Sequence, residues 1–225
     1  MSQRHLELGA ADGHRFDAYV ATPPAEPRGA IVVLQEIFGV NAHVRSVADG
    51  YAADGFVAVA PALFDRVERG LEIGYEPADV QRGIALKTAS PNDKALLDIA
   101  AAIAHAAQAS GGKVGIVGYC WGGLLAWLSA CSLDGLACAV AYYGGGMPAH
   151  KSLQPRCPVL VHFGERDQSI PLTAAEDFRA AQPKVEVHFY PAGHGFNCEQ
   201  RAAYEPASAR LARERSLAFF ARHLG

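Results

Sequence analysis

The sequence contains no long apolar run, no excess of one charge and no cluster of cysteines. None of its apolar stretches approaches the ~20 residues that a membrane-spanning helix requires. The 20 basic and 23 acidic side chains nearly cancel, to a net charge of −3. Such a balance provides neither the basic surface of a nucleic-acid-binding protein nor a polybasic membrane anchor. We therefore expect no nucleic-acid partner and no membrane association.

The chain also lacks a secretory signal and a disulfide framework. Its opening residues, MSQRHLE, contain no apolar segment of the kind that a signal peptide needs. The cysteines number five, an odd count, and are scattered at Cys120, Cys131, Cys138, Cys157 and Cys198. This usage suits a reducing compartment, so we expect a cytoplasmic protein. Because half of the 225 residues are hydrophobic and only 19% are charged, we expect one domain spanning residues 1–225.

Short apolar runs, typical of strands buried in a parallel sheet, alternate with helical patterns along most of the chain. We predict strands at residues 4–8, 16–21, 30–34, 57–60, 113–117, 137–142, 158–163 and 185–190. Helices are predicted at 41–53, at 93–108 with Asn92 as the N-cap, and at 208–224. This alternation predicts an α/β fold with an open, mostly parallel sheet and helices on both faces. Ligands bind such sheets beyond the carboxyl ends of the strands.

A cysteine follows the strand predicted at 113–117, in the segment Gly118-Tyr119-Cys120-Trp121-Gly122. Glycines two positions before and after Cys120 are typical of a nucleophile elbow, where the sharp turn from strand to helix excludes larger side chains. The helix N-terminus favours a thiolate at Cys120, and the Trp121 N–H faces the position where an oxyanion would form. The alternative is a buried structural cysteine in a glycine-rich turn.

Two later strand ends carry residue types that would assist such a nucleophile. Asp167 comes shortly after the strand predicted at 158–163, with Glu165 as a rival carboxylate two residues earlier. His194 lies between glycines on a loop, where it has no apolar surface to pack against. The order of nucleophile, acid and histidine, each after a separate strand, is that of the α/β-hydrolase triad. The residues alone leave the choice between Asp167 and Glu165 open.

The remaining polar residues carry weaker signals. His162 and His188 lie within apolar strands, so we expect both to be structural. No pair of cysteines or histidines has zinc-binding spacing, and we expect no metal. The glycines at 111–112 and 144–146 lack the Lys-Ser/Thr ending of a phosphate loop, so we expect no cofactor. The charged residues at 65–68 and 210–215 are expected on the solvated surface.

Four segments together form an uncommon combination, with a cysteine in the elbow and a glutamate after the first core strand. They are residues 35–39 (QEIFG), 61–64 (PALF), 118–123 (GYCWGG) and 193–196 (GHGF). In these segments the chain resembles the dienelactone hydrolase family, and the resemblance covers nearly its whole length. It implies an α/β-hydrolase fold that hydrolyses a lactone or related ester, with Cys120, Asp167 and His194 as the catalytic triad.

The resemblance also implies two roles that the residues alone do not show. In the family, the glutamate that matches Glu36 interacts with the cysteine and helps to activate it when substrate arrives. A carboxylate beside a thiol can accept its proton or destabilise a premature thiolate. The alternative for Glu36 is a carboxylate that caps the helix at 41–53. Ile37 would supply the second oxyanion-hole amide beside that of Trp121.

Substrate binding is where the sequence departs from the family. There, two arginines hold the carboxylate of the substrate, and Arg66 matches one of them. The other is expected four residues after the catalytic histidine, where this chain has Cys198. Arg201 lies three residues further along and is the candidate to replace it. Because a missing charged contact changes substrate preference, the departure concerns the substrate and leaves the ester chemistry intact.

From these observations we expect a cofactor-free hydrolase acting on a small-molecule lactone or ester. A thioesterase or broad-specificity carboxylesterase is the alternative enzyme, because Cys198 replaces an arginine. A second class is a non-catalytic α/β-hydrolase fold that binds a ligand, which the three retained triad residues disfavour. We expect a monomer, with a dimer as the alternative.

Overall fold

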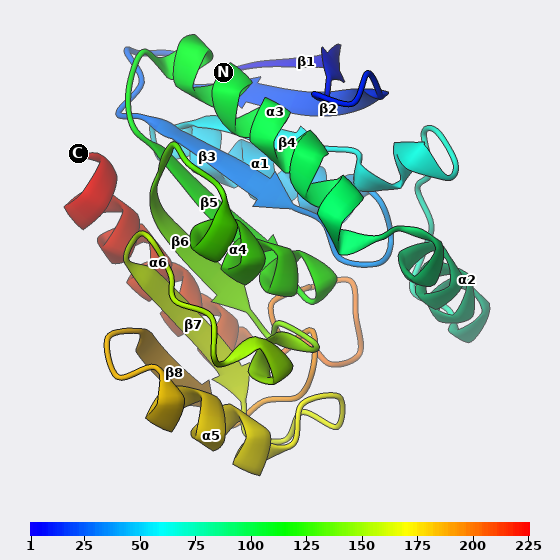
Figure 1. Cartoon of the computed structure of the whole chain (residues 1–225), viewed down its shortest axis with the longest axis vertical. Coiled ribbons are helices and arrows are strands. Elements are labelled where there is room, and N and C mark those ends of the chain that lie inside the picture. Colours follow the sequence, from blue (N-terminus) through cyan, green and yellow to red (C-terminus); the bar gives the residue numbers. More distant parts are fainter.

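The protein, described here by a computed structural model of residues 1–225, is built around one eight-stranded sheet (Figure 1). The strands are β1 (Ser2–Gly9), β2 (Arg15–Thr22), β3 (Ala30–Leu34), β4 (Val57–Pro61), β5 (Val114–Tyr119), β6 (Leu136–Tyr142), β7 (Val159–Gly164) and β8 (Glu186–Tyr190). Their order across the sheet is β1-β2-β4-β3-β5-β6-β7-β8. Strands β1 and β2 run antiparallel to their neighbours, and all other pairs are parallel.

Helices cover both faces of this sheet. They are α1 (Ala42–Ala53), α2 (Pro77–Ala89), α3 (Asn92–Ser110), α4 (Trp121–Ser132), α5 (Leu172–Ala181) and α6 (Pro206–Leu224). Figure 1 shows α3, α4 and α5 in front of the sheet and α1 and α6 behind it, while α2 lies outside both layers. The predicted α/β fold with a mostly parallel sheet is therefore confirmed. None of the helices combines the length and the apolarity that crossing a bilayer requires.

The apolar runs of the sequence are the central strands. Every residue of β3, β4 and β5 is buried, because helices shield both faces of the sheet there. Strand β8, at the edge, is only partly covered: of its five residues, Tyr190 alone is buried. All eight strands lie where the sequence placed them, within a few residues at each end.

Two predicted helix starts were wrong. Asn92 is the first residue of α3 and not its cap, and Pro91 precedes it as the N-cap. The Asn92 side chain is used elsewhere, because its Oδ1 accepts a hydrogen bond of 3.0 Å from the Trp121 indole Nε1. The last helix begins at Pro206, two residues before the predicted start, since the Glu205 carboxylate caps its free N–H groups.

The charged segment 65–68 was wrongly expected to be solvated surface throughout. Asp65 is buried, and its two carboxylate oxygens accept hydrogen bonds from the backbone N–H groups of Asp17 (2.8 Å) and Gly70 (3.0 Å). It ties the loop after β4 to β2. The helices α2 and α5 were not predicted, because neither carries a long apolar stripe: in α2 only Gly83 and Leu86 are buried.

His162 in β7 is structural, as expected. Its ring is fully buried, with Nδ1 2.8 Å from the Tyr190 hydroxyl and Nε2 3.0 Å from Ser216 Oγ. Because Ser216 already donates to the Ala212 carbonyl, Nε2 must donate to Ser216 and Nδ1 accepts from Tyr190. Burial lowers the pKa of His162 well below its ordinary value, so the ring stays neutral.

Candidate active site

Cys120 lies at the turn between β5 and α4, at the carboxyl end of the sheet. Its backbone has φ 55° and ψ −115°, a strained conformation for a residue other than glycine. A Cβ atom at Gly118 would overlap the carbonyl oxygen of Gly122, and one at Gly122 would lie 2.6 Å from the Leu34 carbonyl oxygen. The two glycines are thus required by close backbone approach, as the nucleophile elbow predicts.

A continuous hydrogen-bond chain joins three of the predicted residues. His194 Nε2 lies 3.1 Å from Cys120 Sγ, and His194 Nδ1 lies 2.8 Å from Asp167 Oδ2. The other oxygen of Asp167 accepts from the backbone N–H groups of Ser169 (2.8 Å) and Ile170 (3.2 Å). Glu165 is exposed, whereas the carboxylate of Asp167 is fully buried. The structure therefore brings Asp167, and not Glu165, to the histidine.

The surroundings of His194 favour its charged form. Burial lowers the pKa of the ring, but the hydrogen bonds to Asp167 and Cys120 outweigh that effect and raise the pKa to about 10. At neutral pH the ring is then an imidazolium whose Nε2–H donates to the sulfur. His194 is thereby placed to exchange a proton with the Cys120 sulfur.

Two backbone amides next to Cys120 have no acceptor within the protein. The Trp121 N–H belongs to the first residue of α4, which has no intrahelical partner. The Ile37 N–H lies on the loop after β3 and likewise makes no backbone hydrogen bond. The Trp121 ring is fixed by stacking on Phe64, at 5.2 Å between centroids. Both N–H groups are thus free of protein acceptors, and the oxyanion-hole role that the resemblance implies for Ile37 and Trp121 stays a prediction.

Glu36 is buried beside this site and forms an ion pair. Its Oε1 accepts a hydrogen bond of 3.1 Å from Arg201 Nη1, while Oε2 has no partner. Arg201 also lies over the Phe38 ring, 5.4 Å from its centroid. Glu36 does not cap α1, because Asn41 does so with its own side chain. In the structure Glu36 is therefore held by Arg201, and not by Cys120.

Cys198, which stands where the family has an arginine, does not line the cavity beside Cys120. It is fully buried, beside His43 and Tyr75. Burial lowers the pKa of His43, but Cys198, Glu36 and Glu199 together raise it to about 9.

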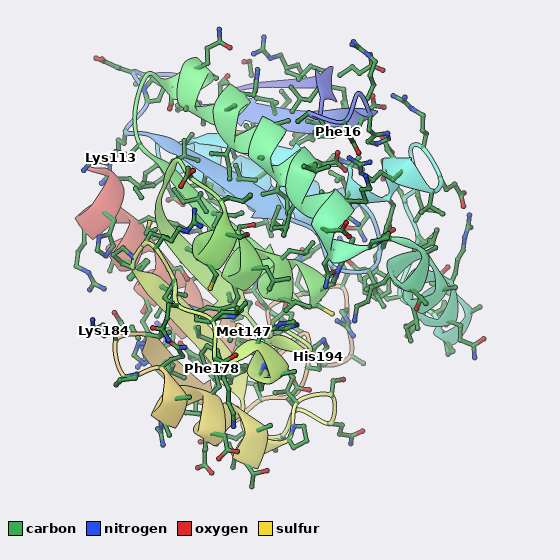
Figure 2. The ribbon with its side chains drawn as sticks, in the orientation of Figure 1. Phe16, Lys113, Met147, Phe178, Lys184 and His194 are labelled. Carbon is green, nitrogen blue, oxygen red and sulfur yellow. The ribbon has the colours of Figure 1, made fainter.

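A cavity of about 310 Å³ lies in front of Cys120. It is lined by Ile37, Phe38, Val80, Ile84, Lys87, Cys120, Gly145, Gly146, Ser169, His194 and Arg201. Figure 2 shows His194 far from Lys184, which lies toward the other end of the sheet. The cavity thus occupies the carboxyl ends of the strands, where parallel sheets bind ligands.

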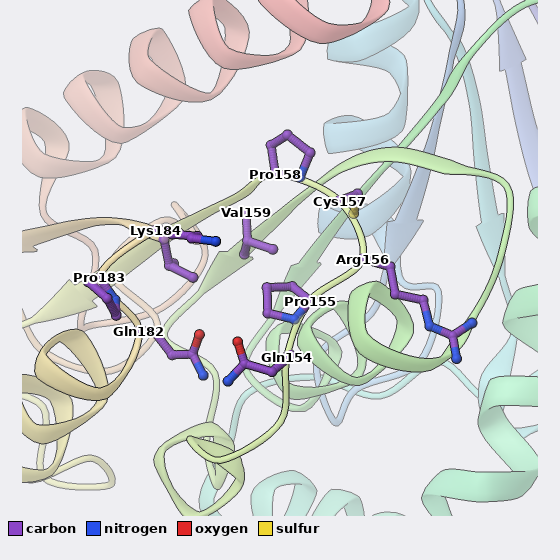
Figure 3. A pocket seen from close by; sticks show the side chains of 10 residues that line it. Gln154, Pro155, Arg156, Cys157, Pro158, Val159, Gln182, Pro183 and Lys184 are labelled. Atoms are coloured by element: carbon purple, nitrogen blue, oxygen red, sulfur yellow. The ribbon is translucent and has the colours of Figure 1, made fainter.

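A larger cavity, of about 410 Å³, lies at the amino ends of β7 and β8 and is lined by residues 154–159 and 182–185 (Figure 3). Its one thiol belongs to Cys157, and burial raises the pKa of that thiol to about 11. No histidine lines the cavity. The larger cavity therefore lacks an activated nucleophile, and the smaller one is the candidate site.

The structure does not bring Arg66 to the cavity. The Arg66 guanidinium is bound by the buried Asp98, at 2.7 and 2.8 Å, and by Asp12, at 3.0 and 3.1 Å. These two carboxylates satisfy it, so Arg66 ties the loop after β4 to α3 and to the turn between β1 and β2. The expected pair of arginines, Arg66 and Arg201, does not converge.

Instead, α2 supplies a cation that sequence reasoning missed. Val80, Ile84 and Lys87 line the cavity from one face of α2, and Lys87 is half-buried with no carboxylate paired to it. Their spacing of four and three residues is the one signal that could have revealed them. The spacing alone did not indicate a binding site, because the sequence does not reveal that α2 lies over the cavity.

The sheet order, the elbow and the hydrogen-bonded Asp167–His194–Cys120 chain define an α/β hydrolase. Comparison with known proteins specifies the family, because the model of the dienelactone hydrolase family matches residues 16–224. The chain belongs to the dienelactone hydrolase family, and it is an enzyme that hydrolyses esters or lactones.

Individual relatives agree with this assignment. The carboxymethylenebutenolidases of Pseudomonas putida and Pseudomonas knackmussii are each 38% identical to the chain, over 96% of it and 95% of their own length. Among solved structures, a Klebsiella pneumoniae protein described as a putative dienelactone hydrolase superposes with a TM-score of 0.86. It is 30% identical, over 99% of this chain and 100% of its own.

Proposed function

We propose that this enzyme cleaves its lactone or ester through Cys120, with His194 as the proton carrier and Asp167 as the group that orients it. The observation that carries the proposal is the unbroken hydrogen-bond chain from Asp167 Oδ2 to Cys120 Sγ at the wall of the cavity. Two unpaired amides beside the sulfur support it, because a tetrahedral intermediate needs donors there.

The first half of the reaction forms a thioester. The Cys120 sulfur attacks the carbonyl carbon, and the carbonyl oxygen becomes an oxyanion that accepts hydrogen bonds from the Ile37 and Trp121 amides. When the intermediate collapses, the C–O bond of the ester breaks. The leaving alkoxide takes the proton from His194 Nε2, so that the ring becomes neutral while the acyl group stays on sulfur.

The second half returns the enzyme to its starting state. With Cys120 acylated, the thiol no longer supports the charge on His194, and the neutral ring can act as a general base. Water gives a proton to Nε2 and its oxygen attacks the thioester carbonyl. Collapse of the second intermediate breaks the C–S bond and returns Cys120 and His194 to their starting state. Asp167 holds the ring in one orientation throughout.

For Glu36 we propose a part in the control of Cys120. In the structure the Glu36 carboxylate is paired with the Arg201 guanidinium, and Arg201 lines the cavity beside Cys120. Replacing Glu36 with glutamine leaves the Arg201 charge unneutralised, which favours an anion on Cys120. We expect alkylation of Cys120 by iodoacetamide at neutral pH to become several-fold faster, while ester turnover falls, because the carboxylate no longer takes part when substrate arrives.

The test is a pair of pH profiles, of alkylation and of turnover, for wild type and Glu36→Gln. Glu214→Gln is the matched control, since Glu214 forms an exposed ion pair on α6. Superimposable alkylation profiles for wild type and Glu36→Gln would show that Glu36 and Cys120 are not coupled.

We further propose that the substrate carries a carboxylate. The named activity of the Pseudomonas relatives concerns a lactone with a carboxymethylene substituent. In this chain Lys87 and the part of Arg201 not used by Glu36 face the cavity, and they supply positive charge without Arg66. Such cations bind a carboxylate by charge-assisted hydrogen bonds.

Replacing Lys87 with methionine should therefore discriminate by substrate charge. We expect KM for a p-nitrophenyl hemiester with a terminal carboxylate to rise about 10-fold, which is the lower end for a hydrogen bond to a charged group because Lys87 is partly solvated. KM for the p-nitrophenyl ester of the same chain length without the carboxylate should stay within twofold. Lys184→Met, in the other cavity, is the control. Equal effects on both esters would overturn the proposed substrate charge.

The second candidate is a thioesterase or a carboxylesterase for uncharged substrates. Val80 and Ile84 favour it, because they give the cavity an apolar wall, and Arg201 is partly neutralised by Glu36. The same panel separates the two candidates: a wild-type enzyme with higher kcat/KM for the uncharged ester, or for an acyl-thioester, supports this second function.

A further inference from the structure

A glycine of helix α2 packs directly against Ile37, one of the two candidate oxyanion-hole residues. Gly83 and Leu86 are the buried residues of α2. A Cβ atom at Gly83 would overlap the carbonyl oxygen of Ile37 and lie 3.1 Å from Ile37 Cγ1 and 3.2 Å from the Ile37 carbonyl carbon. The backbone of α2 therefore rests directly on Ile37, which lines the same cavity as Cys120.

The conformation of Gly83 does not itself call for glycine. Gly83 is not among the glycines with positive φ, and it lies in the middle of a regular helix, where glycine is disfavoured relative to alanine. The remaining physical reason for its presence is the close approach to Ile37. A side chain there would have to push α2 away or move Ile37.

The loop that carries Ile37 is held from its other side as well. The Phe38 carbonyl accepts a hydrogen bond of 3.1 Å from Ile73 N, and a Cβ atom at Gly39 would overlap the Leu71 carbonyl oxygen. The loop is thus pinned between the segment 71–73 and α2. The segment 71–73 limits where the loop can move, so a side chain at position 83 would displace Ile37 and, with it, the Ile37 N–H.

We propose that Gly83 is a positioning residue that holds the Ile37 amide at the oxyanion hole and sets the height of α2 over the cavity. The proposal rests on the proposed function in one respect, that the Ile37 N–H stabilises the oxyanion. It also explains why α2 can present Val80, Ile84 and Lys87 to the substrate at a fixed distance from Cys120.

The test is Gly83→Ala, which improves the helix propensity of α2 but adds the atom that overlaps Ile37. We expect kcat/KM for an activated aryl ester to fall about 100-fold, as when an oxyanion-hole donor is lost. Alkylation of Cys120 by iodoacetamide should stay within twofold of wild type, because that displacement forms no oxyanion.

A trifluoromethyl ketone gives a second readout, since its adduct with a thiol carries an oxyanion. Its inhibition constant should rise by the same factor as kcat/KM falls, whereas the inhibition constant of the product carboxylic acid should change far less. Thr88→Ala is the matched control: it also raises the helix propensity of α2, but Thr88 is exposed and does not line the cavity. Its kcat/KM should match wild type within twofold.

Three results would overturn the proposal. They are a Gly83→Ala enzyme with kcat/KM within twofold of wild type, an equal loss in alkylation and turnover, and a fall in thermal stability that accounts for the lost activity. Failure of the proposed function would be seen elsewhere, as undiminished turnover in Cys120→Ala. The comparison of Gly83→Ala with wild type still tests the proposal in that case. The ester kcat/KM and the inhibition constant of the ketone both depend on stabilisation of an oxyanion, whichever group attacks the carbonyl.

Discussion

Replacing Cys120 with alanine is expected to lower kcat for an activated aryl ester by a factor on the order of 10⁵, the scale seen when a triad nucleophile is removed. The reason is that alanine has no atom that can form the thioester. Binding should survive, because the cavity walls and the two amides are unchanged. The measurement is steady-state turnover, together with the mass of the protein quenched during reaction, where wild type should carry the acyl group.

The matched control is Cys131→Ala, on the same helix as the elbow. Cys131 is half-buried, and burial raises the pKa of its thiol to about 11, so it is not an activated nucleophile. Its removal should leave turnover within twofold of wild type. Undiminished activity in Cys120→Ala, or an acyl adduct on Cys131, would refute a cysteine nucleophile at position 120. Cys120→Ser should also be slow, because a hydroxyl is a much weaker nucleophile in this setting.

Replacing Asp167 with asparagine is expected to lower kcat about 10⁴-fold. Asparagine keeps an oxygen for the N–H groups of Ser169 and Ile170, so the loop should hold its shape. Its amide, however, would donate to Nδ1 of His194 and select the wrong tautomer. The negative charge that helps to raise the pKa of His194 to about 10 is lost as well.

The pH profiles of turnover and of Cys120 alkylation distinguish Asp167 from Glu165 as the carboxylate that acts on His194. In Asp167→Asn we expect the pKa of His194 to fall toward its ordinary value. The imidazolium then loses its proton at a lower pH than in wild type. Alkylation of Cys120 at neutral pH should then slow, because fewer sulfurs are paired with a charged ring. Glu165→Gln is the control, and both its turnover and its alkylation profile should match wild type. A large loss in Glu165→Gln would reverse the assignment.

The parts of the protein that could be predicted are those governed by local chemistry. The apolar runs of β3, β4 and β5 are visible in the sequence because both sheet faces are covered. The elbow was recognisable because a tight turn admits only small residues beside Cys120. Loop position and flanking glycines likewise singled out His194.

Other features depended on contacts between distant segments. Arg66 matches a family motif, yet Asp98, 32 residues later, holds its guanidinium. Asn92 is a residue type that commonly caps helices. Its side chain instead accepts a hydrogen bond from the Trp121 indole, 29 residues away. In both cases a partner remote in sequence offered a buried hydrogen bond that local patterning does not reveal.

The sequence by itself thus determined the order of the strands and the family, and it singled out Cys120 as the candidate nucleophile, because each follows from local rules of packing and turn geometry. The folded chain brought Asp167, and not Glu165, to His194, turned Arg66 away from the cavity and brought Lys87 and Gly83 to the site. These outcomes depend on where α2 and the loops lie relative to the sheet edge. That placement is set by surface complementarity among segments far apart in the chain, and such complementarity leaves no periodic trace in the sequence.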